Sequence, residues 1–250
     1  MQSFIHKGIE IAFLDEGKGD AVLLIHGFAS NKEVNWVVPG WFSTLTGAGR
    51  RAIALDNRGH GQSTKLYKPA EYHSSRMAGD VVALMDHLGL KRADVFGYSM
   101  GARIAAFLAL EHPARVRSVV LGGLGSNLVT GAGFHPGIAE ALEAPSLEEV
   151  SDIVGYLFRS FAEQTLSDLR ALAACMRGSR QTLAPEELAK IRVPVLVAVG
   201  SNDPIAGSAR GLAELIPGAE ALDIPGRDHM LAVGDRLFMQ SVLVFLDRRP

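Results

Sequence analysis

A serine placed to act as a nucleophile lies at the centre of the sequence Gly-Tyr-Ser-Met-Gly at 97–101. The segment Asp-Val-Phe at 94–96 predicts a strand before it, and the pattern at 102–110 predicts a helix after it. In that context the two glycines indicate a sharp turn that lifts the hydroxyl of Ser99 to its tip, beside a helix N-terminus that favours negative charge. A glycine-rich turn with an inert serine would share the five residues but would not need this context.

Asp203 and His229 are the predicted partners of this serine. A serine hydroxyl needs a base to remove its proton, and a histidine base needs a carboxylate to orient its ring. Asp203 follows a predicted strand at 193–199, and His229 follows another at 219–224. Catalytic groups collect at the carboxyl ends of such strands. Asp203 also suits a helix N-cap before Pro204, and it can serve both roles.

Other polar side chains are weaker candidates for the base and the acid. Asp228 adjoins His229, and a neighbouring side chain generally cannot reach around to orient the ring. The remaining histidines either come too early in the chain, end a helix or lie in a segment without strands; they include His26, His60, His112 and His135.

Two backbone N–H groups are predicted to stabilise the negative oxygen that forms during attack on a carbonyl. One belongs to Met100, directly after Ser99. The other belongs to Phe28, in the sequence His-Gly-Phe that follows the apolar strand at 21–25. Losing one such donor typically costs about 10²–10³ in rate.

The elements that must position these groups alternate between short apolar runs and helical patterns, which predicts an α/β fold with a largely parallel sheet. An antiparallel edge is expected at 9–14. Further strands are expected at 21–25, 51–55, 94–96, 118–121, 193–199 and 219–224, and helices at 76–88, 102–110 and 235–246.

Strand signals vanish between Gly122 and about Glu187. A capping-box pattern predicts a helix from Ser146 through Leu157, a second helix is expected at 167–176, and Pro185 suits the first turn of a third. We therefore predict a core made of residues 1–122 and 187–250, with residues 123–186 inserted as a helical cap.

Composition narrows the function classes. The chain has 250 residues and a formal net charge of −2 without a basic stripe, which disfavours nucleic-acid binding. No stretch is apolar for the ~18 residues of a membrane span, and no metal-binding or cofactor motif is present. The single cysteine, Cys175, fits a cytoplasmic protein, and its Ala- and Leu-rich surroundings indicate a buried residue rather than a thiol nucleophile.

Taken together, the sequence resembles the α/β-hydrolase superfamily over essentially its whole length. The motifs that carry the resemblance are 26–28, 56–63, 97–101, 200–203 and 226–229. The resemblance implies an eight-stranded, mostly parallel sheet with a helical cap after the sixth strand. It also implies that Asp56 and Arg58 hold loops together and do no chemistry.

A serine at position 99 disfavours the dehalogenases and epoxide hydrolases of this superfamily, which attack with aspartate. The segment 98–103 is similar to that of a menaquinone-pathway lyase, in which the tyrosine and the arginine help to hold substrate carboxylates. Ala102 departs from that pattern. Arg103 therefore has two interpretations: a clamp for a substrate carboxylate or, as we favour, a structural arginine paired with a core acid such as Asp80.

The candidate substrate-binding residues are Tyr98, Arg103, Phe134, Leu157 and Phe161, although the apolar ones also suit contacts between cap and core. The favoured function is a serine hydrolase that cleaves a small ester, lactone or thioester, without a metal or organic cofactor. A carbon–carbon hydrolase or lyase that uses the triad for proton transfer is the alternative, and a ligand-binding receptor is a third. The expected partner is a small-molecule substrate, and the sequence leaves the oligomeric state open.

Overall fold

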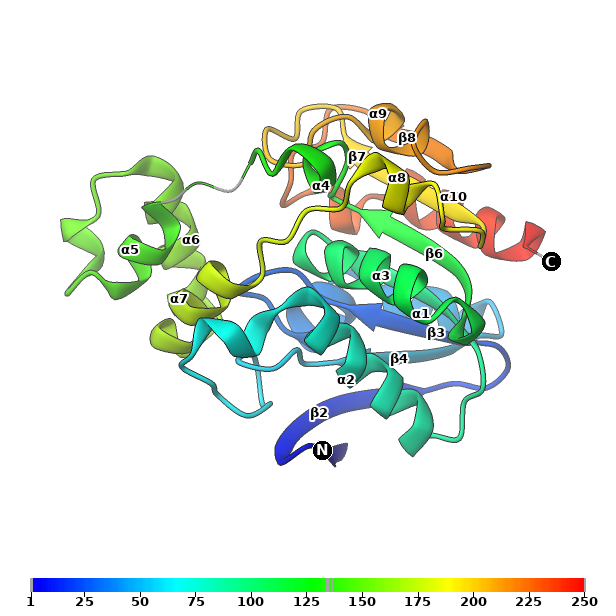
Figure 1. Cartoon of the computed structure of the whole chain (residues 1–250), viewed down its shortest axis with the longest axis horizontal. Coiled ribbons are helices and arrows are strands. Elements are labelled where there is room, and N and C mark those ends of the chain that lie inside the picture. Colours follow the sequence, from blue (N-terminus) through cyan, green and yellow to red (C-terminus); the bar gives the residue numbers. More distant parts are fainter. Residues whose placement is uncertain (1, 134, 136, 250) are drawn as a thin grey trace.

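The computed structural model describes residues 2–133, 135 and 137–249 as an eight-stranded sheet with helices on both faces (Figure 1). The strand order is β1-β2-β4-β3-β5-β6-β7-β8. The pairs β1–β2 and β2–β4 are antiparallel, and all the other pairs are parallel. The predicted α/β class with an eight-stranded, mostly parallel sheet is confirmed.

The strands are β1 (Gln2–His6), β2 (Ile9–Glu16), β3 (Ala21–Ile25), β4 (Arg51–Leu55), β5 (Ala93–Tyr98), β6 (Val116–Gly122), β7 (Val195–Gly200) and β8 (Glu220–Ile224). The helices are α1 (Trp41–Gly47), α2 (Ser74–His87), α3 (Met100–Glu111), α4 (Asn127–Thr130), α5 (Gly137–Glu143), α6 (Ile153–Gln164), α7 (Leu169–Gly178), α8 (Pro185–Leu188), α9 (Ala209–Ala213) and α10 (Arg236–Arg248). A π-helical segment, η1 (Glu33–Val37), follows β3. Within the described residues, none of the helices is long and apolar enough to cross a membrane.

Two hydrophobic cores, one on each face of the sheet, explain why the central strand β3 is apolar at every position. Leu23 and Ile25 of β3 belong to the core under α2 and α3, whereas Val22 and Leu24 belong to the core under α1 and α10. Figure 1 shows these two pairs of helices on opposite sides of the sheet. A parallel strand buried on both faces reads as a continuous apolar run, which made the predicted bounds of β3 and β4 correct.

Helices α4 to α8 lie between β6 and β7 in the chain, and α5, α6 and α7 project together beyond the edge of the sheet (Figure 1). α5 packs against α6 and α7. At the end of α6, the hydroxyl of Thr165 donates to the carbonyl oxygen of Ala29 at 2.9 Å, which ties this segment to the loop after β3. The limits of the predicted cap, 123–186, stay a prediction.

The predicted start of the helix at Ser146 is wrong. Residues Leu147–Glu149 form a single 3-10 turn, and α6 begins only at Ile153. The reason is a better N-cap: a carboxylate oxygen of Asp152 accepts the N–H of Gly155 at 2.6 Å, whereas the Ser146 side chain makes no capping bond. The edge strand β1 and the helices α1, α4, α5 and α9 were not predicted, because their apolar residues are too few to set a period.

Candidate active site

Ser99 occupies the predicted turn between β5 and α3 in a backbone conformation that few side chains adopt, with φ 55° and ψ −113°. A Cβ atom at Gly97 would lie 2.1 Å from the carbonyl oxygen of Gly101, and one at Gly101 would lie 1.9 Å from that of Ile25. Both glycines are therefore required by close backbone contact. The turn packs the start of α3 against the end of β3.

A chain of hydrogen bonds joins Ser99, His229 and Asp203. The distance is 3.0 Å between His229 Nε2 and Ser99 Oγ and 2.7 Å between His229 Nδ1 and Asp203 Oδ2. The Asp203 side chain is fully buried, and that of His229 is 8% exposed. A carboxylate that accepts from Nδ1–H leaves Nε2 free to accept the proton of the serine.

The other oxygen of the Asp203 carboxylate caps a turn. Its Oδ1 atom accepts the N–H groups of Ile205 at 2.8 Å and Ala206 at 3.0 Å. No helix begins at Pro204, since α9 starts at Ala209 with Ser208 as its N-cap. Asp203 thus has a capping role and holds His229 at the same time, but the element that it caps is a turn.

Asp228 is occupied within its own turn. One of its oxygens accepts the N–H groups of Met230 at 3.0 Å and Leu231 at 2.8 Å. The structure therefore brings Asp203, and not the neighbour in sequence, to the ring of His229.

Tyr98 positions the loop that carries His229. Its hydroxyl donates to the backbone carbonyl oxygen of His229 at 2.7 Å, and its ring lies 5.7 Å from the imidazole. A Cβ atom at Gly122 or Gly123 would lie 2.8 Å from the tyrosine ring. These glycines therefore make room for Tyr98.

The two predicted oxyanion donors flank Ser99. Met100 is the first residue of α3, where the N–H group has no carbonyl one turn earlier in the helix. On the other side, Gly27 and Phe28 line the same cavity as Ser99, and a Cβ atom at Gly27 would lie 3.4 Å from Ser99 Cβ.

His26 orients the peptide unit that carries the Phe28 N–H group. Its Nδ1 atom lies 2.7 Å from the carbonyl oxygen of Gly27, which belongs to the same planar peptide unit, and its Nε2 atom accepts the N–H of Asn57 at 2.9 Å. This pattern requires Nδ1 to carry the proton. Burial lowers the pKa of His26, which favours the neutral ring.

His60, His135 and Cys175 make their polar contacts with residues other than Ser99. His60 is buried against the rings of His26 and Phe28, and burial lowers its pKa to about 3. His135 lines the cavity with Nδ1 3.2 Å from a carboxylate oxygen of Asp152. Cys175 is buried in α7, where burial raises the pKa of the thiol to about 12.

A cavity of about 1000 Å³ lies over Ser99 and His229. Of the predicted substrate-binding residues, Tyr98, Leu157 and Phe161 line it, and Phe134 lies outside the described residues. Apolar side chains from α6 and from the segments 34–39 and 230–233 also line it: Val34, Pro39, Val154, Phe158, Met230, Leu231 and Val233.

The sequence did not single out Asn35, although this residue is buried and lines the cavity. Its side-chain oxygen accepts the N–H of Gly27 at 2.9 Å. The available signal was an amide directly before Trp36 in the otherwise apolar run 34–38.

Arg103 was predicted among the candidate substrate-binding residues, but it is not among the described residues that line the cavity. It is 1% exposed, and its guanidinium donates to the carbonyl oxygen of Gln181, after α7. Burial, and secondly the charge of Arg180, lower its pKa to about 10. The structural interpretation of Arg103 therefore fits better than the clamp.

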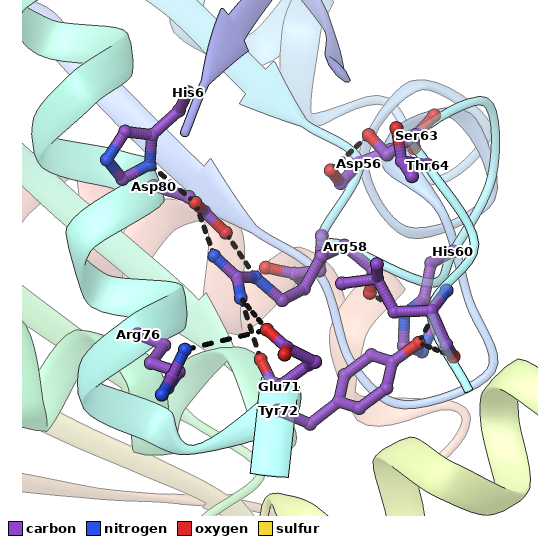
Figure 2. A network of polar contacts seen from close by, with 12 residues as sticks. His6, Asp56, Arg58, His60, Ser63, Thr64, Glu71, Tyr72, Arg76 and Asp80 are labelled. Atoms are coloured by element: carbon purple, nitrogen blue, oxygen red, sulfur yellow. Dashed lines mark hydrogen bonds and ion pairs between the residues drawn. The ribbon is translucent and has the colours of Figure 1, made fainter. Parts of the chain in front are cut away.

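Asp80, the expected partner of Arg103, is bound elsewhere, so that pairing was wrong. Figure 2 shows Asp80 between Arg58 and His6. Its carboxylate accepts from Arg58 at 2.7 and 2.8 Å and lies 2.8 Å from His6 Nδ1. The Arg58 guanidinium also donates to the carbonyl oxygen of Glu71, so it joins the loop after β4 to α2 and to the 3-10 turn Pro69–Tyr72 that precedes α2. Arg58 is closer to Asp80 because it extends from the loop beside α2.

Replacing Arg103 by methionine is expected to lower stability without changing substrate selectivity. The variant leaves the Gln181 carbonyl without this donor, and an unsatisfied buried polar group costs about 1–3 kcal/mol. At about 2–4 °C per kcal/mol the melting temperature should fall by roughly 2–12 °C. Differential scanning calorimetry and kcat/KM for two matched esters, one with a distal carboxylate, test this. Arg210→Met, at an exposed arginine, is the control. A normal melting temperature with selective loss of the anionic ester would contradict the structural role.

The sequence and the structure of this chain are similar to those of known proteins. The family model of the alpha/beta hydrolase fold matches residues 20–181. The chain belongs to this family. A crystal structure of a hydrolase from Pseudomonas aeruginosa PA01 superposes on this α/β hydrolase with a TM-score of 0.81 at 26% identity, covering 98% of this chain and 97% of the other.

Two curated relatives of this α/β hydrolase differ in their names. The non-heme chloroperoxidase CPO-A1 of Kitasatospora aureofaciens is 28% identical, over 96% of this chain and 97% of its own length. A dihydrolipoyllysine-residue acetyltransferase component of an acetoin cleaving system, from Cupriavidus necator, is 33% identical over 89% of this chain, which spans 62% of that protein. Among the described residues of this α/β hydrolase, no three His, Cys, Asp or Glu side chains converge to hold a metal ion.

Proposed function

We propose that this α/β hydrolase cleaves neutral carboxylic esters, lactones or thioesters through an acyl-enzyme on Ser99. The observation that carries the proposal is the hydrogen-bond chain from Asp203 through His229 to Ser99 at a cavity lined mainly by apolar side chains. The chain supplies an activated nucleophile, and the cavity suits the apolar part of an ester.

In the first step Ser99 Oγ attacks the carbonyl carbon while its proton passes to His229 Nε2. The electron pair of the C=O bond moves to the oxygen, which becomes an oxyanion opposite the N–H groups of Phe28 and Met100. Collapse of this intermediate breaks the bond to the leaving group, which takes the proton from His229.

In the second step water attacks the acyl-enzyme, and His229 accepts one of its protons. A second tetrahedral intermediate collapses, the bond to Ser99 Oγ breaks, and the proton returns to the serine. The acid is released and the enzyme is restored. Asp203 keeps its charge throughout and stabilises the imidazolium.

A neutral substrate is favoured because of the charges around the cavity. Among the described lining residues the one arginine is Arg227, and its Nε atom lies 2.6 Å from a carboxylate oxygen of Asp235. An anionic substrate would have to compete with that carboxylate for the guanidinium. This argues against the carboxylate-bearing substrates expected of the carbon–carbon hydrolase or lyase alternative.

The proposal predicts a clear order in a substrate panel. We expect kcat/KM to be highest for p-nitrophenyl esters with an apolar acyl chain, and at least about 10-fold lower for an ester of equal length that ends in a carboxylate, since each 1.4 kcal/mol of lost binding is a factor of ten. Lactones and thioesters of matched size complete the panel, with Ser99→Ala as the control for background hydrolysis. Preference for the anionic ester, or carbon–carbon cleavage of a diketo acid without ester turnover, would overturn this assignment.

A further inference from the structure

Asn35 joins the π-helical segment η1 to the loop that carries the predicted oxyanion donor Phe28. It is 6% exposed, and it lines the cavity with Gly27 and Ser99. The next residue, Trp36, is fully buried with its ring 4.7 Å from that of Phe96, which holds η1 against the core. π-helical turns are rare and occur frequently at functional sites.

The carboxamide of Asn35 has a defined orientation. The N–H of Gly27 needs an acceptor, and Asn35 Oδ1 provides it at 2.9 Å. The Nδ2 atom is thereby turned away from Gly27, and no hydrogen-bond acceptor meets it among the described residues. A buried NH₂ group without an acceptor costs stability, so its presence requires a reason.

Gly27 is consequently held at both of its polar atoms. Asn35 accepts its N–H group, and His26 Nδ1 donates to its carbonyl oxygen at 2.7 Å. The Cα of Gly27 links the peptide unit bonded to Asn35 with the unit that carries the Phe28 N–H. Neither unit can rotate without breaking one of these two bonds.

An aspartate at position 35 would bind the Gly27 N–H through a charge-assisted bond and would leave no NH₂ group without an acceptor. It would also place a negative charge beside Ser99, where the proposed reaction develops a second one. An asparagine supplies the acceptor without that charge. The advantage of an uncharged acceptor over a carboxylate at this position explains why the Nδ2 atom of Asn35 is buried without an acceptor, at a cost in stability.

We infer that Asn35 is a positioning residue that fixes the Gly27–Phe28 segment as a preorganised oxyanion hole while keeping its surroundings uncharged. This inference rests on the proposed function. It assigns to Asn35 an effect on the tetrahedral intermediate, mediated by the loop, and none on the affinity for the ground-state ester.

The test compares Asn35→Leu, Asn35→Asp and wild type at pH 8. Asn35→Leu has nearly the same size but no acceptor, and we expect kcat for the best ester to fall about 10- to 100-fold with KM changed less than about 3-fold; outright loss of a donor costs about 10²–10³. Asn35→Asp keeps the acceptor and the size, so it should fold like wild type. Its kcat should still fall by at least about 10-fold because of the added charge.

A second readout separates this role from a loss of structure. An alkyl trifluoromethyl ketone adds Ser99 Oγ and forms a tetrahedral oxyanion, whereas the matching methyl ketone binds without doing so. In both Asn35 variants the inhibition constant of the trifluoromethyl ketone should rise in proportion to the loss of kcat/KM. The inhibition constant of the methyl ketone should stay unchanged. The control is Asn31→Ala. The Asn31 side chain accepts the N–H groups of Glu33 and Val34 at the start of η1. Removing it should lower the melting temperature, but it should leave the ratio of the inhibition constants of the two ketones as in wild type.

Wild-type kcat in Asn35→Asp, or a loss of kcat in either variant without weaker inhibition by the trifluoromethyl ketone, would overturn the assignment of Asn35. The failure of the proposed function has a different signature. Ester turnover that survives in Ser99→Ala would overturn the acyl-enzyme and the oxyanion hole together.

Discussion

Replacing Ser99 by alanine is expected to abolish ester turnover, with kcat reduced by about 10⁴-fold or more, because the variant lacks the atom that forms the acyl-enzyme. The fold should stay intact. The substitution removes one oxygen, whose hydrogen-bond partner among the described residues is His229. Steady-state kinetics on the best ester measure the loss of turnover, and a melting curve tests whether the fold is intact. Labelling by a fluorophosphonate, which reacts with the serine hydroxyl, should also be lost.

Two comparisons sharpen this experiment. Ser30 lines the same cavity, and Ser30→Ala should keep kcat within a few-fold of wild type. His229→Ala should be about as inactive as Ser99→Ala, and the double variant no worse, since members of a catalytic unit are not additive. Wild-type turnover or labelling in Ser99→Ala would remove the serine from the mechanism.

Asp203→Asn is expected to lower kcat by about 10³–10⁴-fold, whereas Asp228→Asn should change it by less than a few-fold. An asparagine at 203 can present its NH₂ group to His229 Nδ1, which would move the ring proton to Nε2 and leave no acceptor for Ser99. At position 228 the amide oxygen can still accept the N–H groups of Met230 and Leu231.

The matched pair makes the assignment of the acid decisive, because both substitutions remove one negative charge near His229. The measurement is kcat for both variants together with their melting temperatures. If Asp228→Asn were the more damaging substitution at equal stability, the acid would have to be reassigned.

The sequence alone predicted those features of the fold whose physical cause lies in neighbouring residues of the chain. The turn around Ser99 needs glycine at 97 and 101 because neighbouring backbone atoms leave no room for a side chain, and that demand is visible as a pattern of five residues. The buried strands 21–25 and 51–55 were delimited correctly because every position of β3 and all but the first of β4 are buried, and buried positions are apolar there.

The sequence also placed Asp203 and His229 after the strands β7 and β8, which are neighbours in the sheet. Parallel neighbours end at the same edge, so a loop residue after each one can meet the other. What local patterns could not provide was the partner of each polar group. Arg103 and Asp80 were expected to pair, but Arg58 donates to both carboxylate oxygens of Asp80 instead.

Only the tertiary structure decided the contacts between segments far apart in the chain. Tyr98 was predicted as a substrate contact from the resemblance of its segment, and it does line the cavity; only the structure shows that its hydroxyl also donates to the carbonyl oxygen of His229, past Gly122 and Gly123. Asn35 carried almost no signal, because an amide before a buried tryptophan is unremarkable until Gly27 is seen beside it. The physical reason is the same in both cases. A hydrogen bond depends on the positions of both partners in space, whereas a local sequence pattern describes only the chain neighbours of one partner.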